Sequence, residues 1–153
     1  MPPSKPTISI VRLAQEKLAR KPNDPLLLYL QADILTQKGG ASATPEFRLA
    51  MRSAKQAVAL QPSLAPAHTV LAKLYMQTGH YQEAIEQCGE ALAIDLKDRA
   101  AVYRLIQALR RTGQNKEIPE LLSRLAQLRE QATNEEREQY RYKLIEDDNR
   151  QSQ

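Results

Sequence analysis

Few residues in this chain of 153 amino acids could carry out chemistry. Histidine occurs twice, at His68 and His80, and cysteine occurs once, at Cys88. A structural zinc site needs four Cys or His ligands at short, characteristic spacings, and the sequence has neither His-x3-His nor Cys-x2-Cys. A single cysteine also excludes an internal disulfide framework. We therefore predict no metal site and no cofactor.

Nucleophilic and phosphate chemistry are equally unsupported. Cys88 stands on the apolar face of an expected helix, where a buried cysteine behaves as a small hydrophobic residue, and nothing orients His80 against it. His68 occupies a large-residue position of another helix, so we expect it to be packed and hydrogen-bonded. The glycine pair Gly39-Gly40 lacks the Lys-Ser/Thr of a phosphate-binding loop. The sequence predicts that this protein is not an enzyme.

Composition and charge narrow the function further. Hydrophobic residues make up 42% of the chain, enough for a core, whereas aromatic residues are 5% and tryptophan is absent, which disfavours a platform for stacking nucleobases. The net charge is +4, with ten Lys/Arg against four Asp/Glu in residues 1–75 and twelve against fourteen in residues 76–153. Because acids and bases alternate at helical spacing, we interpret them as a solvated helix surface, and we disfavour nucleic acid as a partner.

Membrane and export signals are not evident. The densest apolar run has five residues, at 26–30, far from the roughly 18 of a membrane span. The first six residues lack the apolar stretch of a secretory signal. One cysteine is compatible with a reducing cytosol, which we slightly favour over the periplasm, although the compartment stays open.

The elements that carry these residues repeat every 34 positions. Gly79 and Gly113 are 34 residues apart, and each ends an amphipathic run. Three further sets keep the same step: Ala50, Ala84 and Ile118; Ala57, Ala91 and Leu125; Leu60, Ile94 and Leu128. Pro22 and Pro62 are 40 apart, which is one period plus a six-residue insertion in the loop-like stretch 39–45. One repeating unit therefore accounts for most of the chain.

Each unit reads as two helices joined by a tight turn. Apolar residues recur at helical spacing on both sides of Gly79, whose freedom to adopt a left-handed conformation ends the first helix. Ser63 and Asn23-Asp24 follow prolines and offer caps for the next helix. No alternating strand pattern appears, so the sequence predicts an all-α fold. Ala72 and Ala84 are expected at the helix crossing of the middle unit, where small side chains permit close approach.

These residues resemble the tetratricopeptide repeat (TPR). The middle unit reads His68-x2-Leu71-Ala72-x2-Tyr75, then Ala84-x3-Cys88 and Leu96, against the family pattern Trp-x2-Leu-Gly-x2-Tyr, Ala-x3-Phe and Pro. The resemblance covers residues 8–130 and implies a right-handed superhelical α-solenoid of antiparallel helix pairs. Its parts would be a proline-rich disordered tail at 1–6, a half repeat at 7–22, and repeats at about 24–62, 64–96 and 98–131.

The two ends of the array differ. Thr133-Asn134-Glu135-Glu136 has the form of a capping box, so we expect a C-terminal capping helix at 133–148 that packs through Tyr140 and Leu144, followed by a disordered tail at 149–153. The N-terminal half repeat would expose Ile8 and Val11, whereas a capping element should be polar outside. We therefore favour a fragment of a larger protein over a natural N-terminal cap.

The resemblance also implies a concave groove lined by the first helix of each unit. Projecting the family pattern onto this chain gives candidate peptide-binding residues, which are Tyr29, Asp33, Thr69, Lys73, Met76, Tyr103, Arg104, Gln107 and Arg110. Cations beside tyrosines suit a peptide with acidic and apolar side chains. The clamp that TPR proteins use for the acidic tails of heat-shock chaperones is matched at Arg104 alone, so we disfavour such tails.

We predict a non-catalytic protein–protein interaction scaffold that binds a peptide or protein segment in this groove. The alternative is self-assembly through the open N-terminal edge near Ile8 and Val11, which would give a homo-oligomer. Nucleic-acid binding through the basic surface is a weaker third hypothesis, and it would show a steep dependence on salt.

Overall fold

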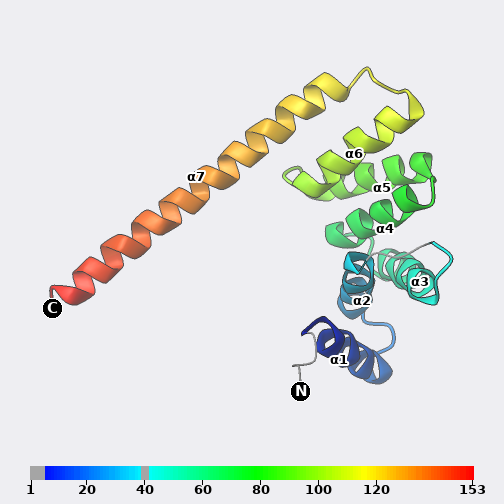
Figure 1. The fold of residues 1–153 in the computed structure, drawn as a ribbon, viewed down its shortest axis with the longest axis horizontal. Helices are drawn as coiled ribbons and strands as arrows, with labels where there is room; N and C mark the ends of the chain where they lie inside the picture. Colours follow the sequence, from blue (N-terminus) through cyan, green and yellow to red (C-terminus); the bar gives the residue numbers. More distant parts are fainter. Residues whose placement is uncertain (1–5, 39–41) are drawn as a thin grey trace.

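The structure, a computed structural model, describes residues 6–38 and 42–153, which form helices without any strand (Figure 1). The helices are α1 (Pro6–Arg20), α2 (Pro25–Gln37), α3 (Pro45–Leu60), α4 (Ala65–Gln77), α5 (Tyr81–Ile94), α6 (Arg99–Thr112) and α7 (Ile118–Gln151). The predicted all-α solenoid is confirmed. The stretch 1–5 of the expected proline-rich tail lies outside the described residues, and Pro6 already belongs to α1.

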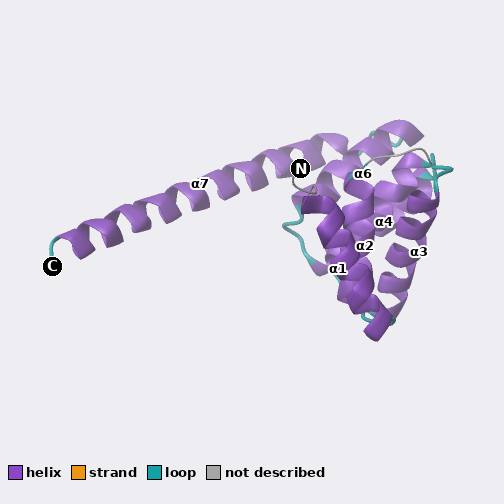
Figure 2. Cartoon of the chain, turned by 60° about the horizontal axis from the view of Figure 1, so that its bottom comes forward, coloured by secondary structure: helices purple, strands orange, loops and turns teal. Residues whose placement is uncertain are grey.

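Consecutive helices pack on one another and build a stack. Contacts join each helix to the next along the chain, and they also join α2 to α4 and α4 to α6. Within the described residues α3 and α5 do not touch each other. The helices α2, α4 and α6 are therefore closer together than α3 and α5, which places them on the inner side of the curved array (Figures 1 and 2).

Local signals set the ends of the helices. Three side chains cap helices by accepting a hydrogen bond from a backbone N–H three residues on: Asp24 from Leu27 (3.2 Å), Thr44 from Phe47 (3.2 Å) and Asp98 from Ala101 (3.0 Å). Gly79 and Gly113 have φ values of 77° and 74°, the left-handed conformation that glycine adopts without a Cβ clash. Ser63 is not a cap, because α4 begins after Leu64, without a side-chain bond to its backbone.

Small side chains form the contact between the middle unit and its neighbour. Ala72, Ala84, Cys88 and Ala108 are fully buried in one cluster that joins α4, α5 and α6. His68 is buried as expected, with Nδ1 2.8 Å from Gln87 Oε1 and Nε2 2.7 Å from the Pro62 carbonyl oxygen. It therefore has a structural role, in which it ties α4 to α5 and to the preceding turn.

The expected break before a separate capping helix is wrong. Helix α7 continues from Ile118 through Thr133 to Gln151, so residues 149–151 of the expected disordered tail are helical as well. Thr133 does not cap a helix; its Oγ1 donates to the Arg129 carbonyl oxygen one turn earlier. The physical reason is that no glycine or proline follows Pro119, so nothing interrupts the backbone hydrogen bonds.

Candidate binding surface

The inner helices α2, α4 and α6 carry the predicted groove residues. Six of them are half-buried, and these are Tyr29, Asp33, Thr69, Lys73, Arg104 and Gln107. They lie on neighbouring helices that contact one another in the order α2, α4, α6. The structure thus brings residues from three units onto one side of the stack, and we call this set the inner surface.

Charges on α2 and α4 act on one another across the inner surface. Burial raises the pKa of the Asp33 carboxyl, and the nearby Lys73 ammonium opposes that rise. Burial also raises the pKa of the Tyr29 phenol, and the carboxylates of Asp33 and Asp98 add to the effect. Asp33 accepts a hydrogen bond of 3.3 Å from Gln37. A ligand here would meet both acidic and basic side chains, with Asp33 close to Lys73.

One threonine on this surface already has a structural partner. Thr69 Oγ1 donates to Asp98 Oδ2 at 2.9 Å, while Oδ1 of the same carboxylate caps α6 by accepting from the Ala101 backbone N–H. Asp98 therefore fixes the start of α6 and its distance from α4 with a single side chain. We assign Thr69 to the joint between units.

A small polar cluster on α6 holds the Arg104 side chain in place. Gln107 Nε2 donates to Tyr103 Oη at 3.0 Å, and Arg104 donates to Gln107 Oε1 at 3.3 Å. The Arg104 guanidinium carbon lies 5.6 Å from the centroid of the Tyr103 ring. These two contacts hold the Arg104 guanidinium in a defined orientation on α6.

Two predicted residues do not join this arrangement. Met76 is half-buried and packs against the cluster of Ala72, Ala84 and Cys88, so it fills the joint between units. Arg110 is exposed near the end of α6, more than one turn beyond Arg104. The inner surface is therefore centred on Tyr29, Lys73 and Arg104.

Sequence reasoning missed Asp98, which touches Thr69 and acts on Tyr29. Its place directly before a helix is the usual signal of a capping residue. That signal identifies the bond to α6, whereas the bond to Thr69 depends on how two successive units stack.

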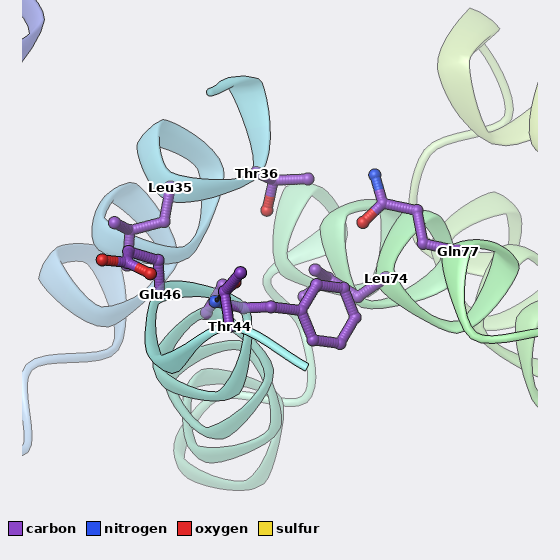
Figure 3. A pocket seen from close by; sticks show the side chains of 8 residues that line it. Leu35, Thr36, Thr44, Glu46, Leu74 and Gln77 are labelled. Carbon is purple, nitrogen blue, oxygen red and sulfur yellow. Dashed lines mark hydrogen bonds between the residues drawn. The ribbon is translucent and has the colours of Figure 1, made fainter. Parts of the chain in front are cut away.

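Sequence reasoning also missed a crevice between α2, the start of α3 and α4 (Figure 3). Leu35 and Thr36 of α2 lie on one side, Leu74 and Gln77 of α4 on another, and Thr44 borders it from the start of α3. The crevice encloses ≈ 10 Å³, room for about one water molecule. It is a packing defect beside the inserted loop, too small for a ligand.

Other kinds of site find little support in the described part of the chain. No group of three His, Cys, Asp or Glu side chains comes together there as metal ligands would. Burial raises the pKa of the Cys88 thiol to about 12, which keeps it in the unreactive protonated form. Over the same residues, none of the helices combines the length and the apolar character needed to cross a membrane.

Solved structures share this fold at low sequence identity. A structure described as "Crystal structure of MamA protein" has a TM-score of 0.66 and 16% identity, with 84% of this chain and 67% of that chain covered. "MamA 41-end from Desulfovibrio magneticus RS-1" has a TM-score of 0.65 and 20% identity, with 79% and 65% covered. The chain therefore spans about two thirds of the length of these neighbours, and it shares their TPR-like α-solenoid fold.

Sequence comparison adds a family. No curated protein matches this chain. The ChAPs family, described as Chs5p-Arf1p-binding proteins, matches residues 5–149, which is nearly the whole chain. Together with the solenoid fold, this match identifies a helical-repeat protein of the kind that serves as an interaction scaffold. The chain belongs to the ChAPs family.

Proposed function

We propose that this protein is a non-catalytic scaffold whose TPR-like units bind a peptide or protein segment on the inner surface. The observation that carries the proposal is the supported Arg104 guanidinium, which stands with Tyr29 and Lys73 on three contacting helices. The family is named for proteins that bind Chs5p and Arf1p, so a protein partner is also what the family name suggests.

The chemistry of the surface favours a segment that carries carboxylates beside apolar side chains. Arg104 and Lys73 would pair with the carboxylates, and the half-buried Tyr29 and exposed Tyr103 would contact the apolar groups. Asp33 would repel a ligand carboxylate placed at α2, so the acidic part of the ligand belongs over α4 and α6.

The test is a pull-down with the immobilised protein and two matched triple variants. The groove variant combines Tyr29→Ala, Lys73→Glu and Arg104→Glu. The control variant combines Gln82→Ala, Arg52→Glu and Lys55→Glu, which makes the same change in charge at exposed positions of α3 and α5. Circular dichroism checks that both variants are folded.

The proposal expects a protein that the wild type and the control capture and the groove variant loses. Its affinity should fall by about tenfold or more for each lost charge-assisted contact. Equal capture by all three proteins would overturn the inner surface as the binding site.

Self-assembly through the N-terminal edge is the second candidate, and a specific observation favours it. Ile10 and Leu13 on α1 are 49% and 52% exposed, while Val11 is half-buried. The side chain of Ile8 lies outside those the structure describes. An assembly built on this edge should dissociate in a Leu13→Glu variant, as measured by mass in solution at several concentrations.

A further inference from the structure

The 34-residue period shows which side chains of each second helix face the next unit. In α3 this stripe is Met51, Ala54 and Val58, which pack in one cluster with residues of α4. In α5 the equivalent stripe is Ile85, Cys88 and Leu92, which pack in clusters with residues of α6. Each stripe is thus covered by the first helix of the unit that follows it.

The equivalent stripe of the last unit is uncovered. Its members are Pro119, Leu122 and Ala126 on α7, and all three are exposed. Leu122 is 42% exposed, whereas Cys88, its counterpart one period earlier, is fully buried. A hollow lined by Tyr103, Leu125 and Arg129 lies between α6 and α7. We call this surface, with Pro119, Leu122, Ala126 and Tyr103, the C-terminal edge.

The second half of α7 has no packing partner among the described helices. Among the described helices α7 contacts only α6, and every residue from 133 to 153 is exposed. In both views the second half of α7 projects alone from the stack (Figures 1 and 2). It nonetheless presents large hydrophobic side chains to solvent, with Tyr140 66% and Leu144 72% exposed.

We propose that a second copy of this chain covers the C-terminal edge. Residues 133–151 of each α7 lie on the C-terminal edge of the other copy, in the position of the first helix of a fourth unit. Tyr140 and Leu144 of one copy then contact Leu122 and Tyr103 of its partner. Because each copy supplies one edge and one projecting helix, the two contacts are identical and close a symmetric dimer.

Charge complementarity supports this pairing. Residues 133–151 carry six Asp/Glu against four Lys/Arg. Residues 99–129, which form α6 and the packed half of α7, carry seven Lys/Arg against two Asp/Glu. An acidic helix would therefore dock on a basic surface, and the orientation of the two chains would be favoured electrostatically.

The geometry excludes the same contact within one chain. Leu122 and Tyr140 lie on one uninterrupted helix, and their 18-residue separation corresponds to about 27 Å along its axis. The projecting half of α7 therefore cannot reach its own edge unless the helix breaks. A second copy meets no such obstacle.

The test uses two single variants at exposed positions, alone and mixed. Leu122→Glu places a charge on the C-terminal edge, and Leu144→Lys places the opposite charge on the projecting helix. The matched control is Leu60→Glu, at an exposed leucine on α3 that belongs to neither edge, and Leu13→Glu tests the N-terminal edge separately. Analytical ultracentrifugation measures the mass of each protein, with circular dichroism as the check on folding.

We expect the wild type, Leu60→Glu and Leu13→Glu to dimerise to twice the 17.3 kDa monomer. Leu122→Glu and Leu144→Lys, each alone, should weaken the dimer by about a hundredfold or more. The reason is that a dimer of either variant buries the new charge at both of its two contacts. A mixture of these two variants should form a dimer again, since one contact is then of the wild-type form and the other joins opposite charges.

Three results would overturn the proposal. A wild type that remains a monomer at millimolar concentration would show that copies do not cover the edge. A dimer lost in Leu13→Glu and kept in Leu144→Lys would assign assembly to the N-terminal edge. Two variants that stay monomeric when mixed would rule out reciprocal exchange.

Discussion

The middle and last units follow the same 34-residue pattern, yet they differ in what surrounds them. In the middle unit α5 lies between α4 and α6, and its stripe of Ile85, Cys88 and Leu92 faces the next unit. In the last unit α7 contacts α6 alone, and its equivalent stripe is exposed. The repeat pattern determines the direction in which a side chain points, whereas burial requires that a neighbour be present.

The difference also separates two kinds of helix stability. Helix α5 gains most of its stability from packing on both sides, whereas residues 133–151 of α7 rest on helix propensity alone within a single chain. Substitutions at buried positions of the middle unit should therefore have larger effects than substitutions at exposed positions of the last unit.

The largest difference is expected for thiol reactivity at positions 88 and 122. Burial raises the pKa of Cys88 to about 12, so its thiolate fraction near pH 8 falls by about a thousandfold from that of an ordinary thiol. A Leu122→Cys variant in a Cys88→Ser background should react at the rate of an exposed thiol. The measurement is the rate of modification by a disulfide reagent in the folded protein.

The raised pKa of Cys88 also predicts that the free energy of unfolding falls as the pH rises above the pKa of an ordinary thiol. Below about pH 9 the thiol is neutral in both states, and its stabilising contribution is complete. Between about pH 9 and pH 12 the unfolded thiol ionises and the folded one does not, so the free energy of unfolding falls. In the modification experiment, equal rates at positions 88 and 122 would contradict the burial of Cys88 and would show that the joint between units opens readily.

The next largest effect is expected for truncation of leucines. Leu74 is fully buried, and Leu74→Ala should lower the free energy of unfolding by about 2–5 kcal/mol because it removes buried methyl groups and leaves a cavity. Leu144→Ala changes a side chain that is 72% exposed and should stay within about 0.5 kcal/mol of the wild type in the monomer. Urea denaturation of both variants at low protein concentration measures this difference.

Enlarging a small side chain should cost less than truncating a large one. Ala84 is fully buried against Ala72 and Cys88. Ala84→Leu should overpack this helix crossing and lower the free energy of unfolding by about 1–3 kcal/mol. Ala126→Leu adds the same atoms at an exposed position of the last unit, so it should be nearly neutral in the monomer, at low protein concentration. An unchanged melting temperature for Ala84→Leu would contradict the close crossing.

Much of this architecture could be predicted from the sequence, since the signals for it are local. The left-handed turns at Gly79 and Gly113 and the cap at Asp24 each depend on one residue and its neighbours. Small residues at regular spacing likewise predicted the crossing at Ala84. Such local signals predict the same turn, cap or helix crossing in any fold that contains the repeat.

The features that could not be predicted arise where one residue pattern is compatible with two different structures. Thr133-Asn134-Glu135-Glu136 satisfies a capping box, but the same residues can continue a helix when no glycine or proline stops it. In the groove, Thr69 and Met76 have the right spacing to face a ligand, yet each already has a partner within the fold. Spacing identifies the face of a helix and leaves open what occupies it.

The smallest expected effect has the opposite sign and lies on α5 itself. Gly89 is exposed within that helix, and a Cβ added there meets nothing within 4 Å. Gly89→Ala should therefore raise the free energy of unfolding by about 0.5–1 kcal/mol, because alanine loses less backbone entropy on folding. Gly79→Ala should instead lower it by about 1 kcal/mol, since Gly79 has a φ of 77°. Parallel urea titrations of the two variants measure both signs, and stabilisation by both would mean that the turn between α4 and α5 does not require its left-handed residue.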